Sequence, residues 1–124
     1  MFFYMKTIIL DTDFIINAVK YKISLESSIK EISPEKCIIA IIDKTLDELK
    51  NKPFEKLSKE LIAHLNIIKT KKDKTVDELI LGLYKENRDI IVATQDRELK
   101  EKLKKGRIPI ITIRQQKYLV LYGA

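Results

Sequence analysis

Two stretches decide the fold of this chain: Ile8-Ile9-Leu10-Asp11-Thr12-Asp13 near its beginning and Ile90-Ile91-Val92-Ala93-Thr94-Gln95-Asp96 in its last third. Each is a short apolar run closed by an acidic turn, which is typical of a buried strand in a parallel sheet. Open α/β sheets place their ligand sites in the crevice outside the carboxyl ends of such strands. The two stretches therefore predict an α/β fold with acidic side chains aimed into one crevice.

The chemistry of that crevice points to a divalent cation. Like charges in one crevice repel, so each carboxylate favours protonation unless a cation lies between them. Mg²⁺ and Mn²⁺ are hard ions that prefer carboxylate and water oxygens. The chain has only one His and one Cys, so it has few of the side chains that a zinc site, a thiol nucleophile or a histidine base would need. We therefore expect Mg²⁺ or Mn²⁺, with the metal activating water.

Composition sets the broader limits. The 124 residues are 45% hydrophobic and 34% charged, which predicts one globular domain spanning 1–124. The net charge of +6 permits a polyanionic partner without requiring one. Cys37 lies in an apolar stretch and has no partner for an internal disulfide, so we expect a buried thiol in a cytoplasmic protein. No apolar run approaches the ~18 residues of a membrane span. Met5 is an equally plausible start, so residues 1–4 are expected to be dispensable.

Strand and helix patterns alternate along the chain, which favours an α/β sheet. The expected strands are Lys6–Leu10, Lys36–Ile42, Asp89–Thr94 and Pro109–Ile113, with Tyr118–Tyr122 as an edge strand or a docked tail. The expected helices are Phe14–Val19, Leu25–Ile32, Lys44–Asn51, Pro53–Ile68, Thr75–Glu86 and Asp96–Lys105, and Lys69–Lys74 is expected to be a charged loop.

Two further acids, Glu48 and Asp77, occur early in predicted helices. Both have a structural alternative. Thr45-x-x-Glu48 matches a capping box, in which the Glu returns to a backbone N–H. Thr75-x-x-Glu78 also matches one, and acids such as Asp77 are favoured in the first turn of a helix. Asp13 could equally cap the first helix. The local pattern alone leaves these alternatives open.

Four acidic blocks carry a resemblance to a known family. They are Ile9–Ile16, Leu46–Leu49, Val76–Glu78 and Ala93–Leu99. In order and spacing they resemble the four acidic blocks of PIN-domain nucleases. The last block, continued to Ile111, is most similar to the archaeal and eukaryotic branch that processes small-subunit ribosomal RNA. The resemblance covers essentially the whole chain, and the first and fourth blocks are the most specific.

The resemblance implies a Rossmann-like parallel sheet with helices on both faces. It also implies a divalent-metal-dependent endoribonuclease that hydrolyses single-stranded RNA. The residues that would converge on the metals as the catalytic set are Asp11, Glu48, Asp77 and Asp96. Thr94 would orient a carboxylate or the water on the metal. Relatives usually carry Asn or Ser at the position of Asp13, which here either adds a metal contact or caps the helix.

Basic side chains near these blocks could guide RNA. Arg97 is favoured as a phosphate contact, because a fork-shaped donor beside a metal ligand suits phosphate oxygens. The other candidates are Lys69, Lys71, Lys72 and Lys74 as a lip beside Asp77, together with Lys100, Lys104 and Arg114. For each lysine a solvated surface role is the alternative. His64 is expected on the solvent side of its helix.

The sequence is compatible with three functions. The leading one is an endoribonuclease that acts on precursor ribosomal RNA. The second is the toxin of a toxin–antitoxin pair, which shares the fold and the acids. The third is a PIN domain kept as a weakly active RNA- or protein-binding scaffold, which the mutually repelling acids disfavour. An aspartyl-phosphate receiver is more distant, because no lysine stands out near the last strand. The sequence is compatible with a monomer or a homodimer.

Overall fold

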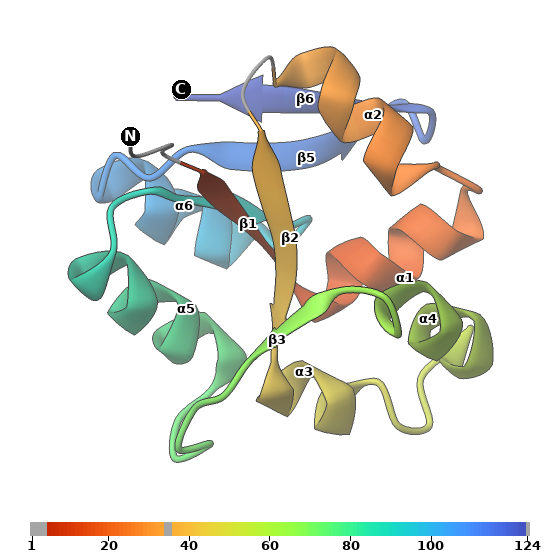
Figure 1. The fold of residues 1–124 in the computed structure, drawn as a ribbon, viewed down its shortest axis with the longest axis horizontal. Helices are drawn as coiled ribbons and strands as arrows, with labels where there is room; N and C mark the ends of the chain where they lie inside the picture. The colour runs from red at the N-terminus through yellow and green to blue at the C-terminus, as the bar shows by residue number, and fades with distance from the viewer. Residues whose placement is uncertain (1–4, 34–35, 124) are drawn as a thin grey trace.

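Strands and helices alternate throughout the part of the chain that the structure describes (Figure 1). The structure is a computed structural model that describes residues 5–33 and 36–123, so the expectation about residues 1–4 lies outside it. The strands are β1 (Lys6–Leu10), β2 (Cys37–Ile42), β3 (Asn66–Ile68), β4 (Ile90–Ala93), β5 (Ile110–Arg114) and β6 (Tyr118–Tyr122). The helices are α1 (Thr12–Lys20), α2 (Leu25–Ile32), α3 (Asp43–Glu48), α4 (Glu55–Ile62), α5 (Val76–Glu86) and α6 (Arg97–Lys105).

The strands form one sheet in the order β3-β2-β1-β4-β5-β6. β1 to β5 pair in parallel, and β1 lies between β2 and β4. β6 pairs with β5 in the antiparallel direction, so Tyr118–Tyr122 is an edge strand and the sheet is mostly parallel. The predicted α/β architecture is confirmed.

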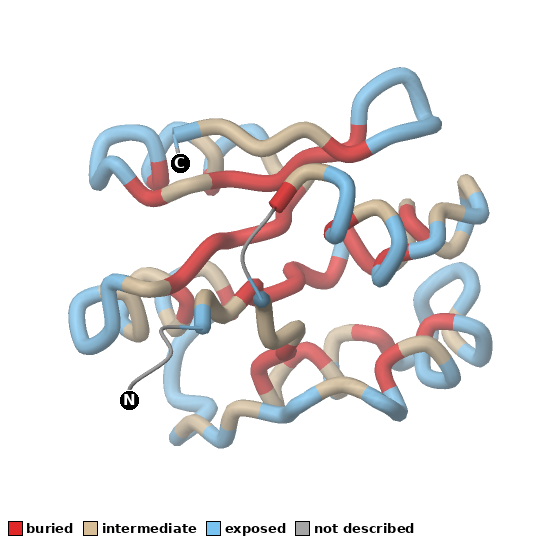
Figure 2. Tube along the Cα trace, turned by 45° about the horizontal axis from the view of Figure 1, so that its top comes forward, coloured by how far each residue is buried: buried red, intermediate tan, exposed pale blue. Residues whose placement is uncertain are grey.

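Helices cover both faces of the sheet, as the alternation of side chains along the strands requires. Ile8 and Leu10 of β1 join a core with residues of α1 and α2 on one face, whereas Ile9 joins a core with α5 and α6 on the other. Buried residues accordingly follow the central strands in Figure 2. Among the described residues, no helix has the length and apolarity needed to cross a bilayer.

The predicted helix Pro53–Ile68 is wrong in its second half. α4 ends at Ile62, and Asn66–Ile68 is the edge strand β3, which pairs with Ala40–Ile42. The helical spacing misled because Leu65 and Ile68, counted on one apolar face of a helix, pack against the two different cores of the protein. The N–H and C=O groups along β2 need partners, and the short β3 supplies them.

Candidate metal-binding active site

Asp11 lies directly after β1, at the carboxyl edge of the sheet. Its backbone N–H donates to Ala93 O at 2.9 Å, which joins the ends of β1 and β4. Asp11 is 5% exposed and stands at the N-cap of α1, yet its side chain makes no capping bond. Its Oδ2 accepts a hydrogen bond from Thr94 Oγ1 at 2.9 Å instead. The strongest hold on the carboxylate is therefore the residue that follows β4.

The environment of Asp11 disfavours its charged form. Burial raises the pKa of Asp11 from 3.8 to about 6. Hydrogen bonds from the Thr94 side chain and the Thr12 backbone lower the pKa, whereas the neighbouring Asp77 and Asp13 charges raise it. A buried carboxylate of this kind gains from a nearby cation, which would neutralise the charge that burial penalises.

Thr94 connects Asp11 to Asp96. The fully buried Thr94 hydroxyl donates to Asp11 and accepts from the Asp96 backbone N–H at 3.0 Å. Asp96 Oδ1 accepts from the backbone N–H groups of Glu98 at 2.8 Å and Leu99 at 3.2 Å, so Asp96 caps α6. This cap uses one carboxylate oxygen and leaves the other without a hydrogen bond among the described residues, so capping and metal binding are compatible here.

Glu48 enters the same region from the end of α3. Its Oε1 accepts a hydrogen bond from Thr12 Oγ1 at 2.5 Å. The alternative capping box with Thr45 is wrong, because α3 begins at Asp43. Thr45 is fully buried inside α3, and its hydroxyl has no hydrogen-bond partner among the described residues. Glu48 is therefore fixed by the residue that follows Asp11.

Asp77 and Asp13 have no side-chain hydrogen bond among the described residues. Thr75 caps α5: its Oγ1 accepts from the Glu78 backbone N–H at 3.2 Å and donates to Glu78 Oε1 at 3.1 Å, which leaves Asp77 outside the cap. Burial raises the pKa of Asp77, and Asp96, Glu48 and Asp13 raise it further, while Lys102 lowers it. The capping alternative for Asp13 is also wrong, because the N-cap position of α1 belongs to Asp11.

All five acids line one pocket of about 280 Å³. Its remaining lining residues are Thr12 and Lys52. The residues come from four places distant in sequence, which the parallel sheet order brings to one edge. The sequence reasoning did not assign a role to Thr12 or Lys52. A hydroxyl between two aspartates was a visible signal for Thr12, whereas nothing local distinguishes Lys52 from other lysines.

The donor set of this pocket fits a hard divalent cation. Five carboxylates and a threonine hydroxyl offer oxygen ligands, and two of the acids have raised pKa values. Within residues 5–33 and 36–123, no three His, Cys, Asp or Glu side chains stand close enough to hold one ion jointly. Mg²⁺ commonly keeps several waters and uses one or two carboxylates, which a pocket of this size allows. The fit is therefore to a hydrated ion.

The two predicted basic regions differ in their surroundings. In the Lys69–Lys74 loop, Lys72 Nζ lies 3.1 Å from Asp47, and Lys44 Nζ donates to the Lys74 carbonyl. Arg97, Lys100, Lys104 and Arg114 have no ion pair among the described residues. The loop is thus partly neutralised by its own chain.

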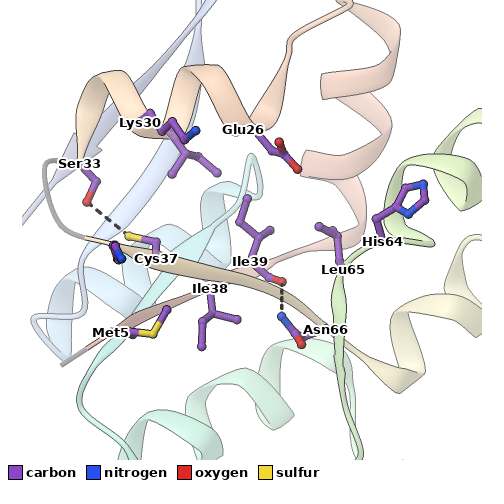
Figure 3. A pocket seen from close by; sticks show the side chains of 12 residues that line it. Met5, Glu26, Lys30, Ser33, Cys37, Ile38, Ile39, His64, Leu65 and Asn66 are labelled. Carbon is purple, nitrogen blue, oxygen red and sulfur yellow. Dashed lines mark hydrogen bonds between the residues drawn. The ribbon is translucent and has the colours of Figure 1, made fainter. Parts of the chain in front are cut away.

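A larger cavity of about 570 Å³ lies elsewhere, between α2 and the amino-terminal ends of β2 and β3 (Figure 3). Apolar and polar residues line it in equal number, and it shares none of them with the acid pocket. The single Cys and the single His line this cavity. His64 is exposed, as expected, and Cys37 is partly rather than fully buried. Neither residue contributes to the acid pocket.

Comparisons with known proteins define the family. A family model described as "PIN like domain" matches residues 8–116. The chain is 38% identical to "Ribonuclease VapC4" of Methanocaldococcus jannaschii, over 96% of this chain and 98% of that protein. The chain belongs to the PIN-domain family of nucleases.

Two further similarities agree with this assignment. The chain is 31% identical to "rRNA-processing protein FCF1 homolog" of Homo sapiens, over 90% of this chain but only 59% of that protein's length. The solved structure titled "Structure of the PIN domain endonuclease Utp24" superposes with a TM-score of 0.83 at 24% identity. That superposition covers 95% of this chain and 92% of the other, and it establishes likeness of fold.

Proposed function

We propose that this protein is a divalent-metal-dependent endoribonuclease that hydrolyses phosphodiester bonds in single-stranded RNA. The observation that carries the proposal is the convergence of Asp11, Glu48, Asp77 and Asp96 on one pocket at the carboxyl edge of the sheet. Membership of the PIN-domain family and the ribonuclease relative support it. A pure binding scaffold would gain nothing from keeping these repelling charges together.

Asp11, Glu48, Asp77 and Asp96 would together hold hydrated Mg²⁺ or Mn²⁺, one or two carboxylates directly and the others through the ion's waters, and Asp13 offers a fifth carboxylate in the same pocket. The bound metal would supply charge neutralisation at the scissile phosphate and a nucleophilic water near neutral pH. The chain's own contribution is geometric. Thr94 fixes the Asp11 carboxylate and the start of α6, and Thr12 fixes Glu48. These bonds keep three acids oriented before substrate arrives.

Arg97 would contact a phosphate next to the reacting one. It follows Asp96 directly, it is exposed, and it has no ion pair among the described residues. A guanidinium can bind two phosphate oxygens at once, which a lysine cannot do with the same geometry.

Precursor ribosomal RNA is the substrate class we favour, because of the similarity to the rRNA-processing relative. Incubation with a precursor small-subunit transcript tests this. Discrete cuts outside the mature sequence would support it. Equal cutting of unrelated cellular RNAs would instead favour a general ribonuclease such as a toxin.

The activity itself is tested with labelled single-stranded RNA in Mn²⁺ or Mg²⁺, with and without chelator. We expect cleavage that chelator abolishes and that Asp96→Asn lowers by about 10²–10³-fold, similar to the loss of one preorganised charge-stabilising group. Asn still caps a helix, so the fold should survive. Glu60→Gln, on the exposed side of α4, is the control that removes a charge elsewhere. Metal-independent cleavage, or full activity of Asp96→Asn, would refute the proposal.

A further inference from the structure

A row of cations lies on one flank of α6, beside the acid pocket. Arg97, Lys100 and Lys104 are spaced at i, i+3 and i+7, which places them on one side of the helix. Leu99 and Leu103 form the buried stripe of the same helix. At about 1.5 Å per residue, Arg97 and Lys104 lie roughly 10 Å apart along the axis. The row therefore begins at the active-site acid Asp96 and leads away from it.

Arg114 joins this row from β5. Side chains alternate along a strand, and Ile110 belongs to the core covered by α6, whereas Ile111 and Ile113 belong to the opposite core. Arg114 has the same parity as Ile110 and so points to the α6 side of the sheet. Its backbone ends β5 at the carboxyl edge where the acids are, and its side chain reaches back toward Tyr122, which pairs with Ile110 at the other end of β5.

Gln95 fixes the end of β5 relative to the acids. Its Oε1 accepts from Thr112 Oγ1 and from the Ile113 backbone N–H, each at 2.6 Å, and its Nε2 donates to Ile113 O at 3.3 Å. Gln95 lies between Thr94 and Asp96 in sequence. The turn that carries the active-site acid therefore also holds the segment that carries Arg114.

The guanidinium of Arg114 is oriented by Tyr122 of β6. Its Cζ lies 5.3 Å from the centre of the Tyr122 ring, and it donates a hydrogen bond to the Tyr122 hydroxyl. Stacking on an aromatic face restricts the side chain while leaving most guanidinium donors free. Arg114 is thus exposed but restrained, which suits a binding residue more than a solvated one.

The four cations lack a counter-ion in the described part of the chain. No acid forms an ion pair with any of them. Partial burial lowers the pKa of the Lys100 ammonium most, and Lys104, Arg114 and Arg97 lower it further, whereas Asp96 raises it and offsets only part of this effect. Such a cluster carries a repulsive cost that a polyanion would remove. In the Lys69–Lys74 loop, one of the four lysines, Lys72, is already paired with Asp47.

We propose that Arg97, Lys100, Lys104 and Arg114 form a track that binds the phosphates of single-stranded RNA on the β5–β6 side of the acid pocket. The Lys69–Lys74 loop, in contrast, contributes little to binding. The inference rests on the proposed function in taking RNA as the partner, and it adds the path that the strand follows from the pocket.

The test measures binding of a fluorescent oligouridylate in chelator, where cleavage cannot occur, over a series of salt concentrations. Each single-strand phosphate contact contributes a slope of about −0.7 in log affinity against log salt. The double variant Lys100→Gln/Arg114→Gln should weaken binding severalfold and flatten the slope by about 1.4. Arg114→Lys/Lys100→Arg, which keeps both charges, should retain most of the slope.

Matched controls separate a specific track from general charge. Lys85→Gln/Lys105→Gln removes two exposed cations from α5 and α6 and should leave the slope near wild type. Lys69→Gln/Lys71→Gln should do the same. The track is refuted if either control flattens the slope as much as Lys100→Gln/Arg114→Gln, or if that variant binds like wild type. Wild-type cleavage in Mn²⁺ is scored separately. A track variant that loses binding while the wild type never cleaves RNA would preserve the track and overturn the proposed function.

Discussion

The five acids of the pocket fall into two groups that differ in how the protein holds them. Asp11 and Glu48 each accept a side-chain hydrogen bond from a distant part of the chain, and Asp96 accepts backbone hydrogen bonds from the first turn of α6. Asp77 and Asp13 line the same pocket without a side-chain hydrogen bond among the described residues. The first group has its geometry before any ligand binds, whereas the second can adjust to one.

This difference shows how a site can be both preformed and unfavourable. The buried Asp11 is fixed where its charge is costly, and Thr94 offsets only part of that cost. Asp77 adds negative charge from α5. Functional sites commonly sacrifice stability in this way. A cation would reverse the balance, because the same charges that repel one another would attract it.

The largest expected effect is on the free energy of unfolding of the metal-free protein, and it comes from Asp11 in the hydrogen-bonded group. Its folded-state pKa of about 6 lies above the ordinary 3.8, so the folded state binds the proton more tightly. Stability from this group is present below pH 4 and is lost as pH rises through 6. At about 1.4 kcal/mol per pKa unit, the ionised form costs roughly 3 kcal/mol.

Asp11→Asn removes that cost. In chelator the variant should match wild type below pH 4 and exceed it by up to about 3 kcal/mol above pH 6, as measured by urea unfolding across pH. Asn retains an oxygen that can accept from Thr94. A variant that is less stable than wild type at pH 7 would show that Asp11 is a stabilising structural residue instead.

A smaller effect is expected from removing the hydroxyls that hold the first group. Thr94→Val keeps the shape of a buried side chain but leaves Asp11 without its donor. Mutation of a residue that orients a metal ligand typically lowers metal affinity or activity by 10–100-fold. We therefore expect a loss of about that size in the cleavage rate or in Mn²⁺ affinity. Thr12→Val should act in the same way through Glu48.

Thr45→Val is the matched control for these hydroxyls. Thr45 is equally buried, but its hydroxyl has no partner among the described residues. Its replacement should leave cleavage unchanged and stability equal or higher. Equal losses in Thr94→Val and Thr45→Val would mean that the threonines matter for packing rather than for orientation of the acids.

Much of the fold was predictable because its central strands carry strong local signals. The runs before Asp11 and Asp96 are continuous, β-branched and closed by acidic turns, so both strands and the place of their acids follow from the sequence. β3 was not predictable in this way. Three residues are too short to establish an alternation, and Asn66–Ile68 forms a strand only because the edge of β2 needs a partner.

The details of the site depend on contacts between distant residues. Glu48 had a sound local interpretation as a cap, and the local pattern alone could not choose between that role and the site implied by the family resemblance. The structure brings Glu48 into the pocket, where it bonds to Thr12, 36 residues away in sequence. Gln95 is similar, since its bonds to Thr112 and Ile113 form across the sheet. Sequence patterns report on neighbours in the chain. Together with the family resemblance they identified the acids and Thr94, but not Thr12 or the bonds of Gln95.

The central claim is that the acids of both groups form one cation site, and Mn²⁺ binding tests it most directly. In thermal unfolding at increasing Mn²⁺ concentrations, the midpoint temperature of wild type should rise. The stabilisation should be about 2.7 kcal/mol when the Mn²⁺ concentration is a hundredfold above Kd. The shift of the midpoint on adding Mn²⁺ should be much smaller in Asp11→Asn and Asp77→Asn than in wild type. Among the pocket variants it should be reduced least in Asp13→Asn, and in Glu60→Gln it should equal that of wild type. A response that persists unchanged in Asp11→Asn and Asp77→Asn would contradict a shared metal site.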